Sequence, residues 1–444
     1  MPRPFTPLSC CALALAACSP NGSSPAAPGP AALGLSVRGH AAVRLRSTSP
    51  IQHVVVIIQE NRTFDNLFNG YPGANTVTQG LDSAGQTLPL KEIPLDDRSV
   101  VGHELTDFLS AYDGGKMDGF DLETGGGAPG YYAYERTRKG DVRTYWDIAA
   151  QYVLADNHFP SNLDSSFVAH QYLIAAQAQS AVDIPSANWG CTEGYDEVPT
   201  ITQQRTYGPG ESPCFDYTTI ADELDAADLT WRYYAPAVSV AGGTWSAYQA
   251  IDHIYQYGQG PLWTADVISP ETKVLSLAPD GTLPAVTWVV PSVVNSDHPG
   301  LTKDTGPSWV ASVVNAIGES PYWSSTAIFV LWDDWGGFYD HVPPPQKDYD
   351  GLGIRTPLLC ISPYAHKGVV SHEQYESAGI LRFIEDTFGL QQLAAADARA
   401  TSAAKGCLDY TQQPRPFTPF TKLKYSREFF LRQAPDYRPP DTDF

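Results

Sequence analysis

Four short, largely apolar runs constrain the fold of this chain more than any other feature of its sequence. Each is five or six residues long, and together they cover residues 54–58, 286–290, 327–332 and 357–361. Apolar runs of this length that do not alternate with polar residues are typical of parallel strands buried on both faces. Helical patterns lie between the runs, at 167–178 and 309–317, and another follows the last run, at 374–387. This alternation predicts an α/β fold with a mainly parallel central sheet flanked by helices.

The stretch 180–285 departs from this pattern, because it is rich in Gly, Pro, Tyr and Trp and its turns are irregular. We interpret it as an irregular insertion near the substrate entrance rather than as an independent domain. A chain of 444 residues is long enough for two average domains, but α/β proteins often fill this length with one core and its insertions. We therefore expect one folded domain over residues 51–444.

Residues 1–18 have the features of an export signal. An apolar stretch from Leu8 to Ala17 follows Arg3 and is too short to span a membrane. The Leu-Ala-Ala-Cys sequence that ends at Cys18 resembles a bacterial lipobox, in which the cysteine is lipidated and becomes the new N-terminus. Ordinary cleavage near Ala17, which leaves Cys18 unmodified, is the alternative.

Residues 19–50 are rich in Pro, Gly, Ala and Ser, a composition that predicts a flexible linker without a core of its own. Ser19, directly after Cys18, resembles the signal for outer-membrane sorting in Gram-negative bacteria. We therefore expect an exported protein of the cell envelope, either an outer-membrane lipoprotein or periplasmic, with secretion as the alternative. A lipid anchor is the only membrane contact that the sequence predicts.

Four cysteines follow Cys18, and an oxidising compartment favours disulfides between them. Cys191 and Cys214 flank a loop rich in Gly, Pro and polar residues, so we predict a bridge between them. A bridge between Cys360 and Cys407 then follows by elimination. Because Cys360 lies in an apolar run, a buried free thiol is the alternative there.

Acidic residues stand at the carboxyl ends of two predicted strands. Glu60 and Asn61 lie just beyond the first apolar run, and Asp333 and Asp334 lie just beyond the third. Ligands of open α/β sheets bind beyond the carboxyl ends of the strands, so two adjacent strands would bring these side chains together. Carboxylates in close approach repel one another unless they are protonated or bridged by a cation, and oxygen ligands suit a hard divalent metal. The alternative is that these acids are only the solvated starts of loops, but the glycine pair at 336–337 permits close backbone approach here and favours the metal site.

Histidines and serines add to this predicted site. His298 and His341 lie just past strand ends near the acids, and His103 stands ahead of a glycine-rich segment. A lone histidine is more often structural, but this placement favours a role in the site. Ser165 and Ser166 stand at the start of a helical pattern, where free N–H groups and the helix dipole favour anions. On position alone, capping the helix is the more common role of such a serine.

The charge balance excludes some classes of partner. The chain has 49 acidic and 28 basic residues, which gives a net charge of -21 and a pI near 4.7. Such a surface repels nucleic acid and anionic lipid head groups. An acidic protein that binds an anionic substrate needs local positive charge, and a bound cation is the simplest source.

Several segments together form a recognisable pattern. They are the opening segment HVVVIIQENRTFD at 53–65, GKMDGF at 115–120, SDHP at 296–299, DDWGGFYDHVPP at 333–344 and the segment 355–364. In sequence and order they resemble the bacterial phosphoesterases that include phospholipases C and the respiratory-burst-inhibiting acid phosphatase. The resemblance spans nearly the whole chain after about residue 53, and its first segment and its GGFYDH loop are specific.

This resemblance implies an alkaline-phosphatase-like fold and hydrolysis of phosphoric ester bonds, of the acid phosphatase or phospholipase C type. The implied substrate is a small-molecule or lipid phosphoester, and the implied cofactor is a divalent metal cation held by the four strand-end residues named above. Ser166 carries over as the nucleophile. His103, His298 and His341 carry over as phosphate-binding or proton-transfer groups.

Two positions depart from the family pattern. The second acid of the later pair is commonly Glu, whereas here it is Asp334. The nucleophile motif commonly has Asn three residues after the Ser or Thr, whereas here His170 stands four after Ser166, so Ser165 remains open as the nucleophile. The rival functions are a sulfatase or phosphonate-type hydrolase on the same fold, and a non-catalytic envelope lipoprotein. Retention of all four proposed metal ligands argues against the second rival.

Overall fold

The computed structural model describes residues 49–186, 189–192, 196–276 and 283–436. The predicted export signal, Cys18 and the linker as far as residue 48 lie outside the described residues. Among the described helices, none is both long enough and apolar enough to cross a bilayer.

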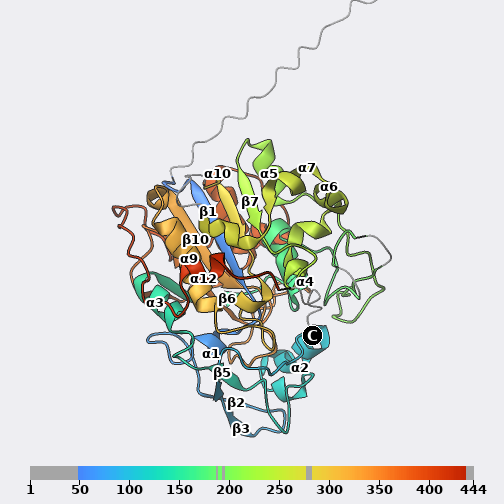
Figure 1. Ribbon diagram of the computed structural model, residues 1–444. Helices are drawn as coiled ribbons and strands as arrows, with labels where there is room; N and C mark the ends of the chain where they lie inside the picture. Colours follow the sequence, from blue (N-terminus) through green and yellow to red (C-terminus); the bar gives the residue numbers. More distant parts are fainter. Residues whose placement is uncertain (1–48, 187–188, 193–195, 277–282, 437–444) are drawn as a thin grey trace, which may run out of the picture. The chain divides into compact units, whose positions relative to one another are not determined.

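A nine-stranded sheet forms the centre of the molecule (Figure 1). Its strand order is β12-β6-β11-β10-β1-β9-β7-β8, and β13 pairs with β6. The strands are β1 (His53–Gln59), β6 (Val153–Phe159), β7 (Trp231–Tyr234), β8 (Val267–Ile268), β9 (Val286–Val289), β10 (Thr326–Trp332), β11 (Thr356–Ile361), β12 (Val369–Ser371) and β13 (Tyr375–Glu376). β11 runs antiparallel to β10 and β6, and the other neighbouring strands are parallel. The predicted mainly parallel sheet is confirmed.

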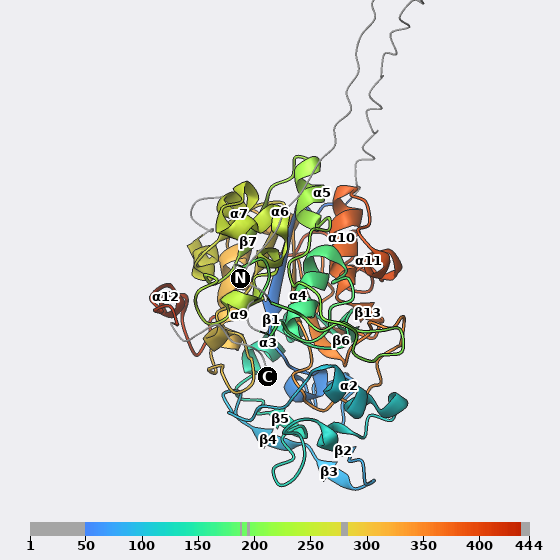
Figure 2. The same ribbon diagram turned by 90° about the vertical axis from the view of Figure 1, so that its right-hand side faces the viewer.

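Helices cover both faces of this sheet (Figure 2). α3 (Arg143–Gln151) and α9 (Gly306–Gly318) pack together on one side, and α4 (Ser166–Ala175) and α10 (Ala378–Phe388) pack together on the other. The shorter helices are α1 (Phe64–Leu67), α2 (Leu105–Tyr112), α5 (Ile220–Ala226), α6 (Asp252–Tyr255), α7 (Pro261–Asp266), α11 (Ala395–Arg399) and α12 (Arg427–Leu431). All ten residues of α4 are buried, which explains why its sequence carries so few charges.

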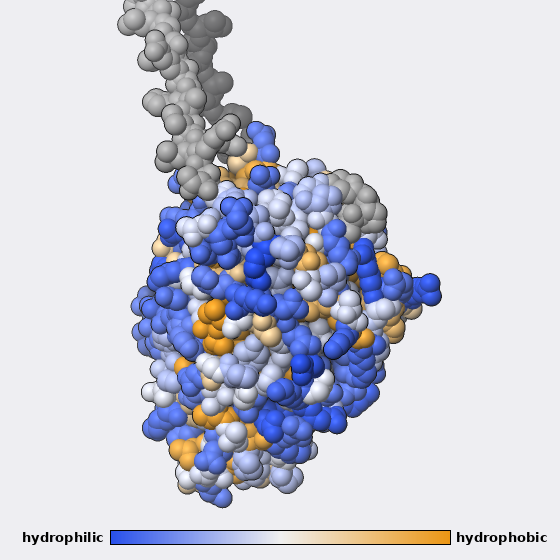
Figure 3. Space-filling model, turned by 90° about the vertical axis from the view of Figure 1, so that its left-hand side faces the viewer, coloured by the Kyte–Doolittle hydropathy of each residue, from blue (hydrophilic) through white to orange (hydrophobic). Residues whose placement is uncertain are grey.

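Two small sheets lie with α2 beyond one end of the central sheet (Figure 1). β2 (Gln79–Leu81) pairs with β3 (Thr87–Pro89), and β4 (Lys91–Ile93) pairs with β5 (Glu135–Thr137). A second, smaller group of buried side chains fills this region, with Phe120 and Trp335 among its members. Hydrophilic residues dominate the face in Figure 3, and the hydrophobic ones form scattered groups on it.

The stretch 180–285 is less irregular than its composition predicts. It contributes β7 and β8 to the edge of the central sheet and α5 beside α4. β7 is four residues long, and its side chains Trp231, Tyr233 and Tyr234 are buried. Large aromatic residues here are therefore part of the core, which a composition rich in Tyr and Trp does not distinguish from a substrate-facing loop.

The cysteines divide into one bridge and one pair of thiols. Cys191 and Cys214 form the predicted disulfide, with their Cα atoms 4.5 Å apart. Cys360 and Cys407 are both free and buried, with their sulfur atoms 2.7 Å apart. The bridge inferred by elimination is therefore wrong, and the alternative of a buried free thiol is confirmed. Burial raises the pKa of the Cys360 thiol well above its usual value, which favours the protonated form.

Candidate active site

The register between β1 and β10 brings the strand-end residues together. The two strands are parallel neighbours, and Gln59 pairs with Trp332, so Glu60 and Asp333 follow at the same edge. The backbone N–H of Asp333 donates to the carbonyl oxygen of Gln59 at 3.0 Å, and the backbone N–H of Asn61 donates to Asp333 Oδ1 at 3.0 Å. The structure thus unites the two motifs that the sequence predicted would meet.

Asn61 adopts a strained backbone conformation at this point. Its φ is 53°, in the left-handed region that residues other than glycine adopt rarely. The backbone hydrogen bond to Asp333 and three contacts of the side-chain nitrogen Nδ2 hold Asn61 in this conformation. Those contacts reach His103 Nε2 at 3.0 Å, Asp334 Oδ2 at 3.1 Å and Ser166 Oγ at 3.2 Å. The amide is therefore the centre of the polar group around Ser166.

Ser166 is the first residue of α4 and lies inside this group. Its hydroxyl donates to Asp334 Oδ2 at 3.1 Å, and its side chain is fully buried. Ser165 occupies the N-cap position, but its side chain makes no capping hydrogen bond. Its backbone carbonyl accepts from the N–H of Ala169 at 3.1 Å, so Ser165 caps the helix through its backbone.

Two carboxylates and a histidine form a second, adjoining cluster. His170 Nε2 lies 3.1 Å from Glu60 Oε1 and 3.6 Å from Asp333 Oδ2. All three side chains are buried, and their candidate ligand atoms lie within 4.8 Å of one another. The cluster has the dimensions of a metal site, and it contains two of the four predicted ligands.

Electrostatics favours a cation in this cluster. Burial, together with the neighbouring Glu60 carboxylate, raises the pKa of Asp333 to about 8. Two ionised carboxylates in a buried site repel each other strongly unless positive charge lies between them. Asp333 Oδ2 is buried and has no hydrogen-bond partner among the residues that the structure describes. These residues therefore fit a divalent cation, whose charge would allow both carboxylates to ionise.

His103 and His298 lie beside each other near Asp334. Their rings lie 6.5 Å apart, and His298 stacks on Trp245 with the ring centres 5.7 Å apart. His103 Nε2 lies 4.0 Å from Asp334 Oδ1, and its Nδ1 lies 3.1 Å from the carbonyl oxygen of Val101. His103 thus contacts Asn61 and lies near Asp334, both of which contact Ser166, while His298 lies beside His103.

The loop that carries His298 is held by a buried network around Asp297. Tyr145 donates from its hydroxyl to Asp297 Oδ2 at 2.6 Å, and the indole of Trp332 donates to the same oxygen at 3.1 Å. Arg62 donates to the backbone carbonyl of Asp297 at 2.8 Å. The network joins the ends of β1 and β10 to the histidine, so the loop position is tied to the sheet.

His341 belongs to a different cluster. Its Nδ1 lies 2.5 Å from Asp65 Oδ2, and its Nε2 lies 3.1 Å from Asn75 Oδ1. Arg355 contacts Asp340 in the same cluster, with 2.9 Å between Nε and Oδ1. Among the described residues, the hydrogen bonds of His341 therefore go to this ion-pair network rather than to the Ser166 group.

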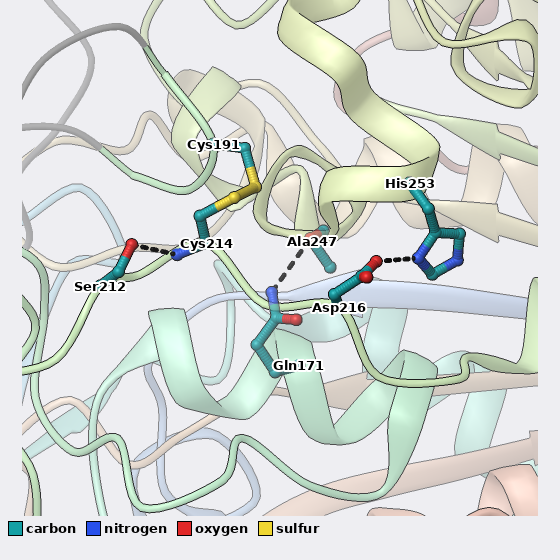
Figure 4. Close-up of a disulfide and its surroundings, with 7 residues drawn as sticks. All are labelled: Gln171, Cys191, Ser212, Cys214, Asp216, Ala247 and His253. Carbon is teal, nitrogen blue, oxygen red and sulfur yellow. Dashed lines mark hydrogen bonds and ion pairs between the residues drawn. A yellow bond between two sulfur atoms is a disulfide. The ribbon is translucent and has the colours of Figure 1, made fainter. Parts of the chain in front are cut away.

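A disulfide supports the segments that lie over α4 (Figure 4). Cys191 donates from its backbone N–H to the carbonyl oxygen of Gln249 at 2.8 Å, and its partner Cys214 precedes Phe215. The ring of Phe215 packs 6.0 Å from Phe167 of α4. Gln171 of the same helix donates to the backbone carbonyl of Ala247 at 3.0 Å. The bridged segments thus fix the helix that positions Ser166 and His170.

His170 is not among the site residues predicted from the sequence, although the sequence contains a signal for it. His170 stands four residues after Ser166, which places both on nearly the same side of an α-helix. The predicted helix therefore already places Ser166 and His170 on one side. A role for His170 in the site becomes visible only from its contacts with Glu60 and Asp333, which are distant in the sequence.

Comparisons with known proteins find similar chains. The model of the phosphoesterase family matches residues 51–391. Hemolytic phospholipase C of Pseudomonas aeruginosa is 24% identical over 412 residues, which are 78% of this chain and 54% of that protein. Phospholipase C A of Mycobacterium tuberculosis is 25% identical over 409 residues, which are 77% of this chain and 73% of that protein. The chain thus spans about half the length of the first of these relatives.

Among solved structures, a protein of the alkaline phosphatase superfamily from Vibrio parahaemolyticus aligns with 77% of this chain and 67% of its own. The TM-score is 0.35 and the sequence identity 9%. The phosphonate monoester hydrolase SpPMH from Silicibacter pomeroyi aligns with 60% of this chain and 72% of its own, at a TM-score of 0.30 and 13% identity.

Proposed function

Because the chain belongs to the phosphoesterase family, we propose that it hydrolyses phosphoric ester bonds in a metal-dependent reaction with Ser166 as the nucleophile. The observation that carries the proposal is the position of the Ser166 hydroxyl. It lies at the N-terminus of a buried ten-residue helix, 3.1 Å from Asp334 Oδ2 and 3.2 Å from the Asn61 amide nitrogen.

This position suits attack on phosphorus. Asp334 accepts the hydrogen bond of the hydroxyl and is placed to take its proton as the serine oxygen attacks. The N-terminus of a helix binds anions through its free N–H groups, so the start of α4 would favour the phosphate oxygens of a substrate. The Asn61 amide supplies a further donor for the charge that develops on those oxygens. Ser165 lacks this set of contacts among the described residues.

Glu60 and Asp333 would hold the divalent cation, with Asn61 and Asp334 beside it. When bound, such a cation supplies Lewis-acid stabilisation of phosphoryl oxygens and lowers the pKa of a coordinated hydroxyl. The predicted ligands are four oxygen-bearing side chains at one sheet edge, and the unsatisfied Asp333 Oδ2 is consistent with their use in this way.

His103 and His298 are the proposed groups for the leaving oxygen and the phosphate. His103 contacts the Asn61 side-chain nitrogen that also contacts Ser166, and the ring of His298 lies 6.5 Å from that of His103. An imidazole at this place can donate a proton to the departing alcohol. Water then cleaves the phosphoserine and restores the hydroxyl. We assign His341 a structural role, because its hydrogen bond to Asp65 supports the loop after β10.

We propose a phospholipid as the substrate class, since two relatives bear the name phospholipase C. A panel of a phosphomonoester, a phosphodiester, phosphatidylcholine and an aryl sulfate, each with and without chelator, separates the alternatives. Loss of phosphoester hydrolysis with chelator is the expected result. Turnover of the sulfate ester alone would favour the sulfatase alternative, and absence of turnover on every substrate would favour a non-catalytic lipoprotein.

The nucleophile is tested by a matched pair of substitutions. Ser166→Ala should lower kcat by roughly 10³-fold or more, because the attacking oxygen is removed. Ser165→Ala removes the same atoms one residue earlier and should retain most of the activity. The reverse result would assign the nucleophile to Ser165. Activity in both variants would contradict serine catalysis and leave attack by water as the mechanism.

A further inference from the structure

The imidazole of His170 lies beside two of the predicted metal ligands, Glu60 and Asp333. It lies one helical turn after Ser166 on α4, and its Nε2 points at the two carboxylates, 3.1 Å from Glu60 Oε1 and 3.6 Å from Asp333 Oδ2. His170 and Asp333 are each 1% exposed and Glu60 is fully buried. One nitrogen and two oxygen atoms thus converge on a point shielded from water.

The helix leaves little freedom for this imidazole to move away. Gln171, the next residue, donates to the carbonyl oxygen of Ala247 and accepts from the hydroxyl of Tyr217 at 2.8 Å. Phe167, one turn before, packs against Trp189 at 5.6 Å between ring centres. The contacts of its two neighbours therefore fix the part of the helix that carries His170, as a preformed ligand requires.

We propose that His170 Nε2 is a direct ligand of the metal, together with Glu60 and Asp333, and that this mixed nitrogen and oxygen set selects a first-row transition ion over Ca²⁺ and Mg²⁺. Ca²⁺ and Mg²⁺ are hard cations that prefer sets made of oxygen alone. Imidazole suits Zn²⁺ and its neighbours, and three protein ligands that include His and a carboxylate are common in catalytic zinc sites. The inference rests on the proposed function only in that a metal binds at this site.

A different arrangement would use the same contacts without a nitrogen ligand. His170 could donate from Nε2 to Glu60 and orient that carboxylate from outside the coordination sphere. The set would then contain oxygen alone and would favour Mg²⁺ or Ca²⁺. The two arrangements differ in whether the metal is bonded to nitrogen, which can be measured directly.

The first measurement is metal selectivity of the purified full chain. After removal of metal by chelation, the protein is dialysed against a mixture of Zn²⁺, Mn²⁺, Mg²⁺ and Ca²⁺, and the bound metal is determined by mass spectrometry. We expect about one transition ion per chain even with Mg²⁺ and Ca²⁺ in large excess. His170→Asn should bind Zn²⁺ at least about 100-fold more weakly. His253→Asn, which removes an imidazole paired with Asp216 and Asp222 outside the site, should bind it as the native protein does.

The second measurement decides the ligand in the native protein. Pulsed electron paramagnetic resonance of the Mn²⁺-loaded chain should show the coupling of a directly bound imidazole nitrogen. The coupling should persist in His103→Asn and His253→Asn and disappear in His170→Asn. A loaded site without nitrogen coupling, or a coupling lost only in His103→Asn, would overturn the inference while leaving metal-dependent hydrolysis intact. A chain that binds no divalent ion would overturn both.

Discussion

Gly336 shows how closely the site depends on single residues. Its φ is 61°, and a Cβ atom built there would lie 2.2 Å from the carbonyl oxygen of Asn61. The backbone of the loop after β10 therefore reaches the strained residue that contacts Ser166. The glycine pair in the sequence indicated such an approach, and the structure identifies its partner.

We predict that Gly336→Ala lowers kcat by roughly 100-fold, because Asn61 must shift away from the new methyl group and the reacting groups lose alignment. Steady-state kinetics and thermal unfolding measure the two effects. Gly85→Ala is the matched control, since Gly85 also has a positive φ, of 76°, but a Cβ there would meet nothing within 4 Å. That control bears the backbone strain without the clash and should keep its activity. Equal losses in both variants would contradict the argument.

The sequence predicted the acids of the site better than its histidines. Glu60 and Asp333 follow strands, and strand ends meet at one sheet edge whatever the rest of the fold does. His341 and His170 required tertiary contacts to assign. His341 stands in the same acid-rich loop as Asp333 and Asp334, yet its two ring nitrogens contact Asp65 and Asn75. In the sequence, His170 stands out only as a departure from the family motif.

Glu271 gives a stability prediction that depends on pH. Its side chain is 5% exposed, and burial raises its pKa to about 7, against opposing hydrogen bonds from Ser292. The folded state therefore binds a proton more tightly than the unfolded state does. The stabilisation is fully present below the unfolded-state pKa, near 4.5, and is lost as the pH rises through 7.

The free energy of unfolding in urea should therefore fall more between pH 5 and pH 8 for the native protein than for Glu271→Gln. The expected difference in the free energy of unfolding is roughly 3 kcal/mol. The exposed Glu319→Gln should behave as the native protein does at both pH values. An identical pH response in native protein and Glu271→Gln would contradict the assignment.

At the scale of elements, the disulfide and α4 form one unit. The bridge joins residues 23 apart in sequence and holds segments that pack on Phe167 and Gln171 of the helix. We predict that replacing both Cys191 and Cys214 by Ser lowers the free energy of unfolding by about 2–4 kcal/mol, mainly because the unfolded chain gains freedom.

Denaturant unfolding of the double variant measures this loss. Reduction of the native protein should reproduce it, because both treatments remove the same cross-link. A reductant that destabilises the double variant as much as the native protein would show that the loss comes from elsewhere, since Cys360 and Cys407 are thiols already.

The strand β6 is not among the predicted apolar runs, and its composition gives the physical reason. β6 reads Val-Leu-Ala-Asp-Asn-His-Phe, and its polar side chains make hydrogen bonds to residues distant in the sequence. Asp156 accepts from the backbone N–H of Asn75 at 2.8 Å, and His158 Nδ1 lies 3.0 Å from Thr356 Oγ1. The four apolar runs, by contrast, are buried on both faces and need no such partners. The antiparallel direction of β11 depends likewise on the path of residues 333–355, which composition does not specify.

At the scale of the whole molecule, the charge balance limits how the protein meets a membrane. The net charge of the whole chain is -21, so anionic head groups repel it. The described helices include none that could cross a bilayer. The attachment that the sequence predicts is a lipid on Cys18.

We predict that Cys18→Ser moves the protein from the membrane fraction to the soluble fraction of cells that lipidate their exported proteins. A single acyl chain holds a protein to a membrane only weakly, but the several chains of a lipidated N-terminal cysteine hold it firmly, so loss of the cysteine should have a large effect. Fractionation followed by immunoblotting measures the distribution, and mass spectrometry of the N-terminus detects the lipid. Cys11→Ser is the matched control, because that cysteine lies within the segment predicted to be removed. Membrane association that survives Cys18→Ser and also survives high salt would contradict the anchor and point to apolar contacts of the fold itself.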